Sequence, residues 1–431
     1  MIDVIKKAFH IPDVRKKIFV TFAILALYRF LVHIPVPNVD LNAIKTIFEQ
    51  NQLFNVINLF SGGGLSQVSI ISLGVGPYIT ASIIMQLLTM VVPQLEELSK
   101  EGQYGREKIN QYTQFLTLPL AIIQSYGLYF IFSKQQVGNL SIMGNMGPFD
   151  ILMMVTIMTG GAFLLMWIAN LITDYGVGNG VSIIIFAGIL ARIPSSLSNI
   201  TLVGADAAQM FNILVFVAIS LVVIAGVVYV NEAYRKIEIQ YSARVSGSKT
   251  TGGGSSYIPV KINQAGVIPI IFAVSIVLLP SFFAGYLQQT SSQQLQDFGL
   301  WLSMNFTPGK PFYTVLYFFL VFIFTYFYTA VTFNPEKIAD DVRRSGGFIP
   351  GVRPGKSTEN YLSYIITRLT FAGGIFLGAI AVLPLVVQNF TGITSLAIGG
   401  TGLLIVVSVV LETVKQIEAQ VITREYETFT R

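Results

Sequence analysis

Long runs of apolar residues, separated by shorter polar stretches, recur along almost the whole chain. A helix needs about 20 largely apolar residues to cross the hydrocarbon core of a bilayer. Ten runs come close to that length, and the shortest of them ends at Arg192 and Pro194. The pattern predicts an all-α integral membrane protein with ten transmembrane helices, at about residues 18–36, 69–92, 113–133, 149–171, 181–198, 210–231, 265–287, 312–333, 368–388 and 397–416.

The composition supports a surface that faces lipid. Of the 431 residues, 53% are hydrophobic and 11% are charged, whereas a soluble globular domain has about 25% charged residues. So few charges cannot form a polar shell around a chain of this length, and lipid must therefore solvate much of its surface. The first apolar run follows a basic leader, but no small-residue cleavage pattern comes after it, so we expect a retained first span.

The distribution of Lys and Arg predicts the orientation of the spans. Cytoplasmic loops of membrane proteins carry an excess of basic residues. With ten spans and a cytoplasmic N-terminus, 22 of the 27 Lys and Arg residues fall on the cytoplasmic side. Removing one central span would reverse every later loop and destroy this separation. We therefore expect both termini in the cytoplasm. Of the five other basic residues, four fall outside and one lies within the first span, namely Lys45, Lys134, Arg192 and Lys310 outside and Arg29 in the span.

Two predicted cytoplasmic loops are long and basic, at about 232–264 and 334–367. The first contains a Gly- and Ser-rich run at 250–256, which could cradle a phosphate, but no Gly-Lys-Ser/Thr follows it. This composition is typical of a flexible loop tip. The second loop has Pro and Gly throughout 346–355, which predicts a turn-rich, non-helical path. Arg353 within it would by default be a solvated loop residue.

A short amphipathic segment, 53–67, lies on the outer side between the first two spans. Phe54, Ile57 and Phe60 recur at helical spacing, and the run Gly62–Gly64 would end a helix. Such a helix is too short to cross a bilayer. It could lie in the outer headgroup region, or it could pack into the bundle as a stopper. Periodicity alone favours the headgroup position.

A short motif occurs twice in the chain. The segments Gly74–Ile83 and Gly266–Ile276 both read G-V-x-P-x-I-x-A, and each opens the second span of a five-span half. One span starts outside and the other inside, which is the signature of an inverted-topology repeat. We therefore predict two halves, 1–200 with spans one to five and 201–431 with spans six to ten. The Gly and Pro would weaken each helix where it begins.

The spans offer little chemistry for an enzyme or a coupled pump. The chain has no cysteine, and its two histidines, His10 and His33, are isolated in sequence. Neither an acid–base pair nor a metal-ligand cluster occurs, so we predict no catalytic residue, no metal and no cofactor. Arg29 is the charged residue inside the first span, and snorkelling to the interface accounts for it. A secondary transporter of a small solute is the main alternative, and a membrane scaffold without a pore is a third.

Seven motifs, in order and over essentially the whole length, resemble the SecY/Sec61 alpha family. Together they are far more specific than any one of them. They read HIPVP (33–37), GVGPYITASIIMQLL (74–88), YGVGNGVSIIIFAGI (175–189), PVKINQAGVIPIIFA (259–273), FNPEKIADD (333–341), GGFIPGVRPGKSTENY (346–361) and GGTGLLIVV (399–407).

The resemblance implies an hourglass pore between the two halves, narrowed in mid-membrane by a ring of branched apolar residues. Matched motif by motif, the ring comprises Val75, Ile79, Val181, Ile185, Ile271 and Ile405. The segment 53–67 matches the plug of the family, which reverses the preference that periodicity alone gave. The plug positions are Phe54, Ile57, Phe60, Gly62, Gly63 and Gly64.

Spans two and seven match the two sides of a lateral gate that opens to lipid. The gate residues implied are Thr80, Ile83, Gln86, Asn263, Phe272 and Ser275. The loops 232–264 and 334–367 match the surface on which the ribosome or the SecA motor docks. The basic residues expected there are Arg244, Lys249, Arg343, Arg344, Arg353 and Lys356, of which Arg353 is the most telling.

The resemblance also implies a function and partners. The chain would be a channel and not an enzyme, passing unfolded secretory polypeptides across the bacterial cytoplasmic membrane and releasing membrane-protein segments sideways into it. The implied partners are SecE-like and SecG-like small membrane subunits, the SecA motor ATPase, the ribosome, signal peptides with nascent or preprotein chains, and the lipid bilayer. Asn170 stands where the family commonly has Glu, and the tip at 244–258 is unusually rich in Gly and Ser. A housekeeping and an accessory translocon therefore both stay open.

Overall fold

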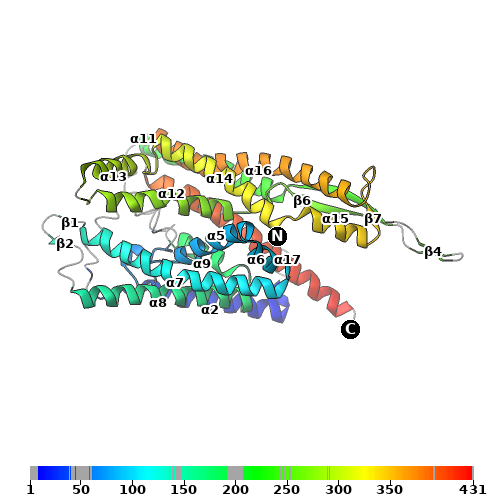
Figure 1. The fold of residues 1–431 in the computed structure, drawn as a ribbon, viewed down its shortest axis with the longest axis horizontal. Helices are drawn as coiled ribbons and strands as arrows, with labels where there is room; N and C mark the ends of the chain where they lie inside the picture. Colours follow the sequence, from blue (N-terminus) through cyan, green and yellow to red (C-terminus); the bar gives the residue numbers. More distant parts are fainter. Residues whose placement is uncertain are drawn as a thin grey trace. The chain divides into compact units, whose positions relative to one another are not determined.

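The described part of the chain forms two compact units (Figure 1). Unit 1 holds Met1–Phe216, Ser275–Tyr313 and Pro384–Arg431, and unit 2 holds Val217–Val274 and Thr314–Leu383. This division differs from the halves 1–200 and 201–431, which stay a prediction about sequence repeats. The computed structural model describes residues 8–37, 39, 44, 58, 61–134, 136–137, 140–141, 147–191, 207–241, 244–246, 249–251, 254–288, 290, 292–391 and 394–429.

A helix occupies each of the ten intervals in which the apolar pattern predicts a span. Several of these helices extend beyond the apolar run into polar sequence, because helix propensity does not end where hydrophobicity does. The helices are α2 (Pro12–Val32), α5 (Gly76–Val91), α7 (Gln103–Lys134), α8 (Pro148–Tyr175), α9 (Gly180–Leu190), α11 (Ala207–Glu232), α12 (Ile268–Leu287), α14 (Pro311–Thr332), α16 (Lys356–Thr391) and α17 (Thr394–Phe429).

Length and apolar character together select fewer of these helices. Among the described residues, three helical stretches are long and apolar enough to cross a membrane by composition alone, namely Pro148–Tyr175, Pro311–Arg344 and Lys356–Val387. Gly76–Val91 with Pro93–Lys100 makes a fourth if the two helices form one broken span. The fold is therefore that of a mostly helical protein with several membrane-crossing helices, and the number of ten spans stays a prediction.

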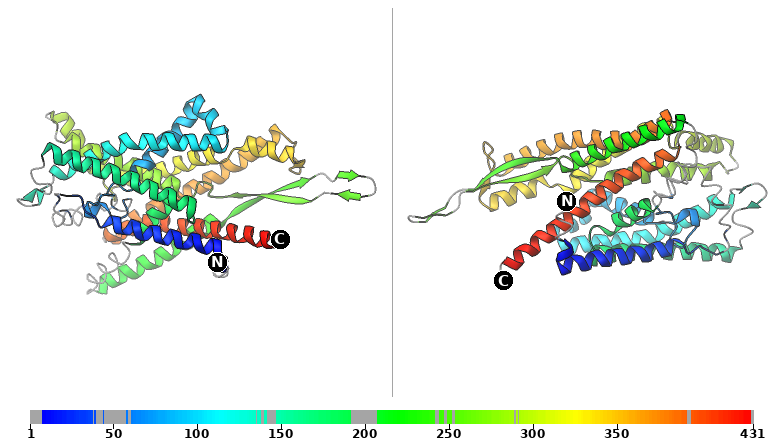
Figure 2. Two further views of the ribbon diagram at one scale, coloured as in Figure 1. Left: turned by 90° about the horizontal axis from the view of Figure 1, so that it is seen from below. Right: turned by 180° about the vertical axis from the view of Figure 1, so that it is seen from behind.

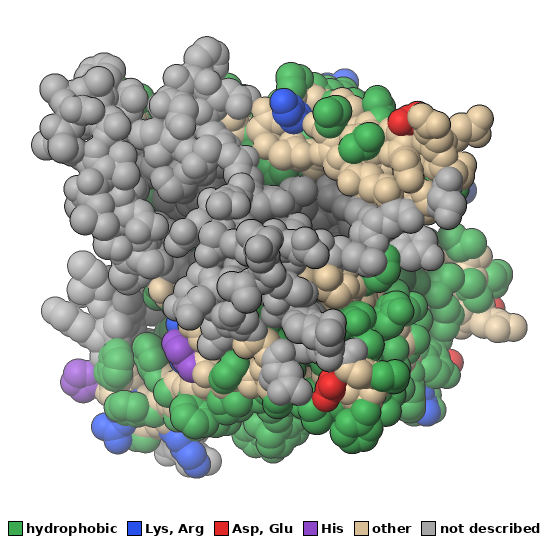
Figure 3. All heavy atoms as spheres, turned by 90° about the vertical axis from the view of Figure 1, so that its left-hand side faces the viewer, with side chains coloured by type: hydrophobic (Ala, Val, Ile, Leu, Met, Phe, Trp, Pro, Cys, Tyr) green, Lys and Arg blue, Asp and Glu red, His purple; other side chains and the backbone are tan. Residues whose placement is uncertain are grey.

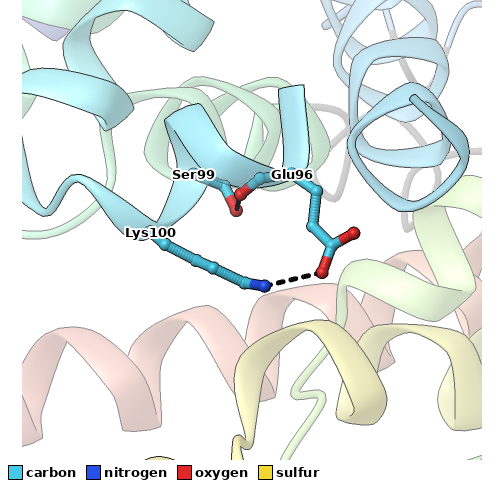
Figure 4. Close-up of polar contacts among 3 residues, drawn as sticks. All are labelled: Glu96, Ser99 and Lys100. Atoms are coloured by element: carbon cyan, nitrogen blue, oxygen red, sulfur yellow. Dashed lines mark hydrogen bonds and ion pairs between the residues drawn. The ribbon is translucent and has the colours of Figure 1, made fainter. Parts of the chain in front are cut away.

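The second predicted span ends in a sharp break. Helix α5 is followed directly by α6 (Pro93–Lys100), and the two are bent by 100°. Val92 between them is extended, with φ −97° and ψ 111°, because a residue that precedes proline avoids the helical region. On α6, Lys100 Nζ lies 2.7 Å from Glu96 Oε1, and Ser99 Oγ donates a hydrogen bond to the Glu96 carbonyl oxygen (Figure 4). These exposed polar groups mark where the apolar run stops.

The two predicted cytoplasmic loops join in one antiparallel sheet within unit 2. Strands β3 (Tyr234–Tyr241) and β6 (Ser255–Lys261) form a long hairpin, and β7 (Gly347–Phe348) from the second loop pairs with the other edge of β3, giving the order β6-β3-β7. The hairpin is visible in both views of Figure 2 (green arrows). Beyond it lie the short strands β4 (Arg244–Ser246) and β5 (Lys249–Thr251), which the prediction of a flexible tip did not anticipate. The most Gly-rich residues, 252–253, lie outside the described part.

An apolar core holds this sheet in place. Ile237 and Val260 from the hairpin pack with Ala339 of α15 (Pro335–Arg344), Ile349 after β7, and Leu362 of α16. Helix α15 begins where Asn334 Oδ1 accepts a hydrogen bond from the Lys337 backbone N–H at 3.0 Å, a standard N-cap. The path over 346–355 is turn-rich as predicted. We conclude that unit 2 carries a compact polar-faced subdomain and not two loose loops.

Both copies of the repeated motif have the same local structure. Gly74 and Gly266 adopt left-handed φ values of 60° and 63°, a conformation that glycine reaches without steric cost. Two residues later, α5 begins at Gly76 and α12 begins at Ile268. The shared glycine therefore sets the same turn into a helix in both segments.

In unit 1, the segment after α2 pairs with the segment before α5, and helices pack around this pair. Pro35 and Ser69 form an isolated antiparallel bridge, flanked by a 2.8 Å hydrogen bond from Val36 N to Val68 O. Leu65, Leu73, Leu128 and Met154 belong to the same buried cluster, which joins this pair of segments to α7 and α8. The structure also describes η1 (Leu65–Gln67), β1 (Gln136–Val137), β2 (Leu140–Ser141) and α13 (Gln293–Asn305) in unit 1.

The outward faces of the helices are apolar. Phe22 of α2, Phe115 of α7, Trp167 of α8 and Val222 of α11 are all more than half exposed. In Figure 3, hydrophobic side chains gather over the lower part of the described surface, with single charged side chains among them. A contiguous surface of this kind is stable in contact with hydrocarbon and not with water.

Candidate functional site

The glycine turn of the predicted plug segment packs closely between two helices of unit 1. Gly62 and Gly63 have left-handed φ values of 68° and 89°. A Cβ on Gly62 would lie 1.7 Å from the hydroxyl oxygen of Tyr28 on α2, and a Cβ on Gly188 of α9 would lie 2.3 Å from Gly62 Cα. Arg29 Nη1 donates a hydrogen bond of 3.3 Å to the Gly62 carbonyl oxygen. Close packing and one charged donor thus fix this turn.

Buried polar side chains stabilise the same turn. Asn58 Oδ1 accepts hydrogen bonds from Ser66 N at 3.1 Å and from Ser61 Oγ at 3.2 Å, while Asn58 O accepts one from Gly63 N at 2.9 Å. Ser72 Oγ donates to Gly64 O at 3.2 Å. Asn58, Ser61 and Ser72 are buried, so a change that removes their partners would leave buried polar atoms unsatisfied. The predicted plug positions Phe54, Ile57 and Phe60 lie outside the described residues.

Most of the predicted pore-ring residues lie in unit 1 and are buried. Val75 immediately precedes α5, Ile79 is on its first turns, and Ile185 is on α9, which packs against α17, the helix of Ile405. Ile185 lies three residues before Gly188, so the helix with this predicted ring residue also contacts the predicted plug segment. The remaining two are Val181, half-buried on α9, and Ile271, buried on the unit 2 part of α12.

The predicted gate residues make hydrogen bonds within their own units. On α5, Thr80 Oγ1 donates to Gly76 O at 3.0 Å and Gln86 Nε2 donates to Ser82 Oγ at 3.3 Å. Gln86 Oε1 is buried and has no hydrogen-bond partner within the described part of the chain. Ile83, on the same helix, is buried.

Asn263 organises the turn that leads into α12, the second helix of the predicted gate. Its Nδ2 donates to Asn231 Oδ1 at 2.8 Å and to Gly266 O at 3.2 Å, and its Oδ1 accepts from Gly266 N at 3.0 Å. Phe272 makes edge-on contacts with two aromatic rings of α14, and Ser275 lies one turn further along α12. A hydrogen bond between Gln86 and Asn263 stays a prediction.

The six predicted docking residues all belong to unit 2. Arg343 forms an ion pair of 3.1 Å with Asp340, and both side chains are exposed. Arg344, Arg353 and Lys356 are also exposed. Arg244 and Lys249 lie on β4 and β5, and their side chains are outside the described part.

Sequence reasoning missed several residues that the structure brings into these sites. Snorkelling explains Arg29 from the sequence alone, although a charged residue inside a span is itself a signal of function. Gly188 carried no signal, because its role depends on Gly62 being beside it. In the hairpin, Lys236 Nζ lies 4.9 Å from the ring centroid of Tyr257. The alternation of apolar residues over 234–241 could have predicted that strand.

Comparisons with known proteins show the family of the chain. A family model described as SecY matches residues 69–414. The protein translocase subunit SecY of Streptomyces galbus is 45% identical, with 100% of both chains covered. One similar solved structure is described as showing that the plug domain of the SecY protein stabilises the closed state of the translocation channel. It matches with a TM-score of 0.65 and 20% identity, covering 94% of this chain and 91% of that one.

The canine Sec61 in a ribosome-channel complex from the endoplasmic reticulum matches with a TM-score of 0.59 and 18% identity, covering 94% of this chain and 91% of that one. At such identities the two structural likenesses concern the fold alone. The family rests on the model match and on the close relative, which extend over most of the sequence. The chain belongs to the SecY family of protein translocase subunits.

Proposed function

We propose that the chain forms a channel that passes unfolded secretory polypeptides across the bacterial cytoplasmic membrane and releases membrane-protein segments sideways into lipid. Family membership gives the protein-translocating role. The observation that carries the channel mechanism is the contact of Gly62 with Gly188, three residues from Ile185 on the same helix. A segment packed there can close a pore lined by Ile185.

The apolar ring and the plug would act together. A narrow ring of Ile and Val dewets when empty and so holds back ions without a charged filter, yet its side chains can yield to a passing polypeptide. The ten spans would form two inverted halves with both termini in the cytoplasm. The turn shared by Gly74 and Gly266 supports the repeat, and the charge distribution supports the orientation.

Energy for transport would come from partners, because the chain itself would act as a channel and not as an enzyme. The canine relative is described in complex with a ribosome, which supports ribosome docking here. SecE-like and SecG-like subunits and a SecA-type motor would complete the complex. The exposed basic residues of unit 2 offer charge for acidic protein surface or for RNA phosphate. A small-solute transporter would instead need an ion-coupling site in its spans.

Replacing Gly188 with Val tests the proposal. The new side chain would collide with the backbone of Gly62, so we expect the plug segment to shift and the resting complex to conduct ions in a planar bilayer. The matched control is Gly160→Val, because a Cβ at Gly160 of α8 meets no atom within 4 Å. A tight Gly188→Val complex that still transports preprotein would contradict the proposed plug contact.

The lateral gate gives a second test. The double variant Gln86→Leu, Asn263→Leu is expected to change how hydrophobic a signal peptide must be to enter lipid. Interhelical hydrogen bonds in membranes are worth about 0.6 kcal/mol, and rarely above 2, so we expect a modest shift of the threshold. The control is Thr423→Leu, because the Thr423 side chain is exposed and donates its hydrogen bond within its own helix. An unchanged threshold across a series of model signal peptides would remove these residues from the gate.

A further inference from the structure

Helix α13 (Gln293–Asn305) folds back onto the end of α12 within unit 1 (Figure 1). Gln288, just after α12, donates hydrogen bonds from Nε2 to Gly299 O at 3.1 Å and to Ser303 Oγ at 3.0 Å. A Cβ on Gly299 would lie only 2.9 Å from Gln288 N. The buried face of α13 is therefore held against α12 by close backbone packing and a side-chain clamp.

The rest of α13 exposes large apolar side chains. Every third residue from Leu295 to Met304 is apolar, and these side chains form a stripe that winds around about half of the helix circumference. The exposed fractions are 40% for Leu295, 52% for Phe298, 48% for Trp301 and 68% for Met304. The rings of Phe298 and Trp301 stack, with centroids 6.1 Å apart, and Trp301 also contacts Phe312 at 5.8 Å. These ring contacts hold the stripe in a defined arrangement.

The position of α13 in the chain selects lipid as the partner of this stripe. Short links, 288–292 and 306–310, join it to the apolar helices α12 and α14. Such links cannot carry α13 far from the membrane surface. The helix has one charged residue, Asp297, so it offers little to a charged protein partner. Trp is enriched where membrane meets water, because its ring is apolar while its N–H can bond to headgroups or water.

We propose that α13 lies in the outer headgroup region and binds lipid through the stripe Leu295–Phe298–Trp301–Met304. A helix with one apolar face inserts that face into the boundary between headgroups and acyl chains. Through Gln288, this attachment would fix the outer end of α12 at the membrane surface. The choice of the outer leaflet rests on the proposed ten-span topology, which places the segment between α12 and α14 outside.

Because the chain contains no cysteine, Met304→Cys introduces a single site for a nitroxide spin label. The labelled full chain is reconstituted in vesicles of phosphatidylethanolamine and phosphatidylglycerol. Power saturation then compares accessibility to oxygen, which dissolves among acyl chains, with accessibility to a water-soluble nickel chelate. Leu27→Cys on α2 gives the lipid reference and Tyr257→Cys on β6 gives the water reference. Both original side chains are nearly half exposed.

We expect the oxygen-to-nickel ratio at position 304 to lie between those of the two references. Adding Phe298→Gln and Trp301→Gln should move the ratio towards the water reference. A ratio at position 304 equal to that of Tyr257→Cys would overturn the proposal, as would an immobile label shielded from both reagents, which would indicate a protein partner. The readout does not depend on transport. A chain that binds lipid here yet translocates no polypeptide would refute the proposed function and not this inference.

Discussion

Replacing Ile79, Ile185, Ile271 and Ile405 with Ser in one variant is expected to make the resting complex conduct ions. These are four of the six proposed ring residues, and all four are buried. The hydroxyl groups of the introduced Ser side chains would hold water in the constriction. A constriction that stays wet offers ions a continuous path. Single-channel conductance of the purified complex in planar bilayers measures the effect. Because the ring acts as a unit, single substitutions should leak less than the quadruple variant.

The matched control replaces isoleucines that face outwards. Ile123 of α7 and Ile323 of α14 are more than half exposed, so Ser at both positions changes hydrophobicity without reaching the ring. This control should remain tight. A quadruple variant as tight as the unchanged complex would remove these residues from the pore. Loss of the folded complex, seen in gel filtration, would show that the buried Ile residues stabilise the core, and the single variants would then decide.

Replacing Arg353 with Glu is expected to abolish motor-driven export while leaving the closed complex tight. Arg353 is exposed, and its guanidinium has no ion pair within the described part of unit 2. The backbone around it is fixed, since Thr358 Oγ1 donates a hydrogen bond of 3.0 Å to its carbonyl oxygen and Gly351 and Gly355 have left-handed φ values. The loop therefore presents the Arg353 side chain from a fixed backbone, and reversing its charge adds repulsion to the lost contact.

Import of a preprotein into vesicles, with motor binding measured alongside, tests this role. Arg353→Ala should be less harmful than Arg353→Glu, because it removes the contact without repulsion. Arg343→Glu is the informative comparison, since Arg343 already pairs with Asp340 and should contribute less to a partner. Normal motor binding and normal import with Arg353→Glu would refute the role. Failure of the complex to assemble would instead indicate a structural residue.

The sequence by itself determined where the helices lie and which family the chain belongs to. Apolar runs predict helices because each span must bury its own backbone hydrogen bonds in lipid, a requirement met locally. The turn at Gly74 and its counterpart at Gly266 is likewise local, since only the φ value of one residue is involved. The motifs that indicate the SecY family are also short, contiguous segments, so they could be read without a structure.

Only the tertiary structure decided which distant segments meet. The contact of Gly62 with Gly188 joins residues far apart in sequence, and neither glycine signals the other. The same holds for β7, which crosses from the second loop to pair with β3, and for α13, which Gln288 folds back onto α12. A hydrophobic pattern predicts which side chains are buried, but it does not predict which residues they pack against. The contact of the predicted plug segment, the sheet formed by the two predicted docking loops and the proposed lipid-binding stripe each depend on which segments pack together, and that is a property of the folded chain.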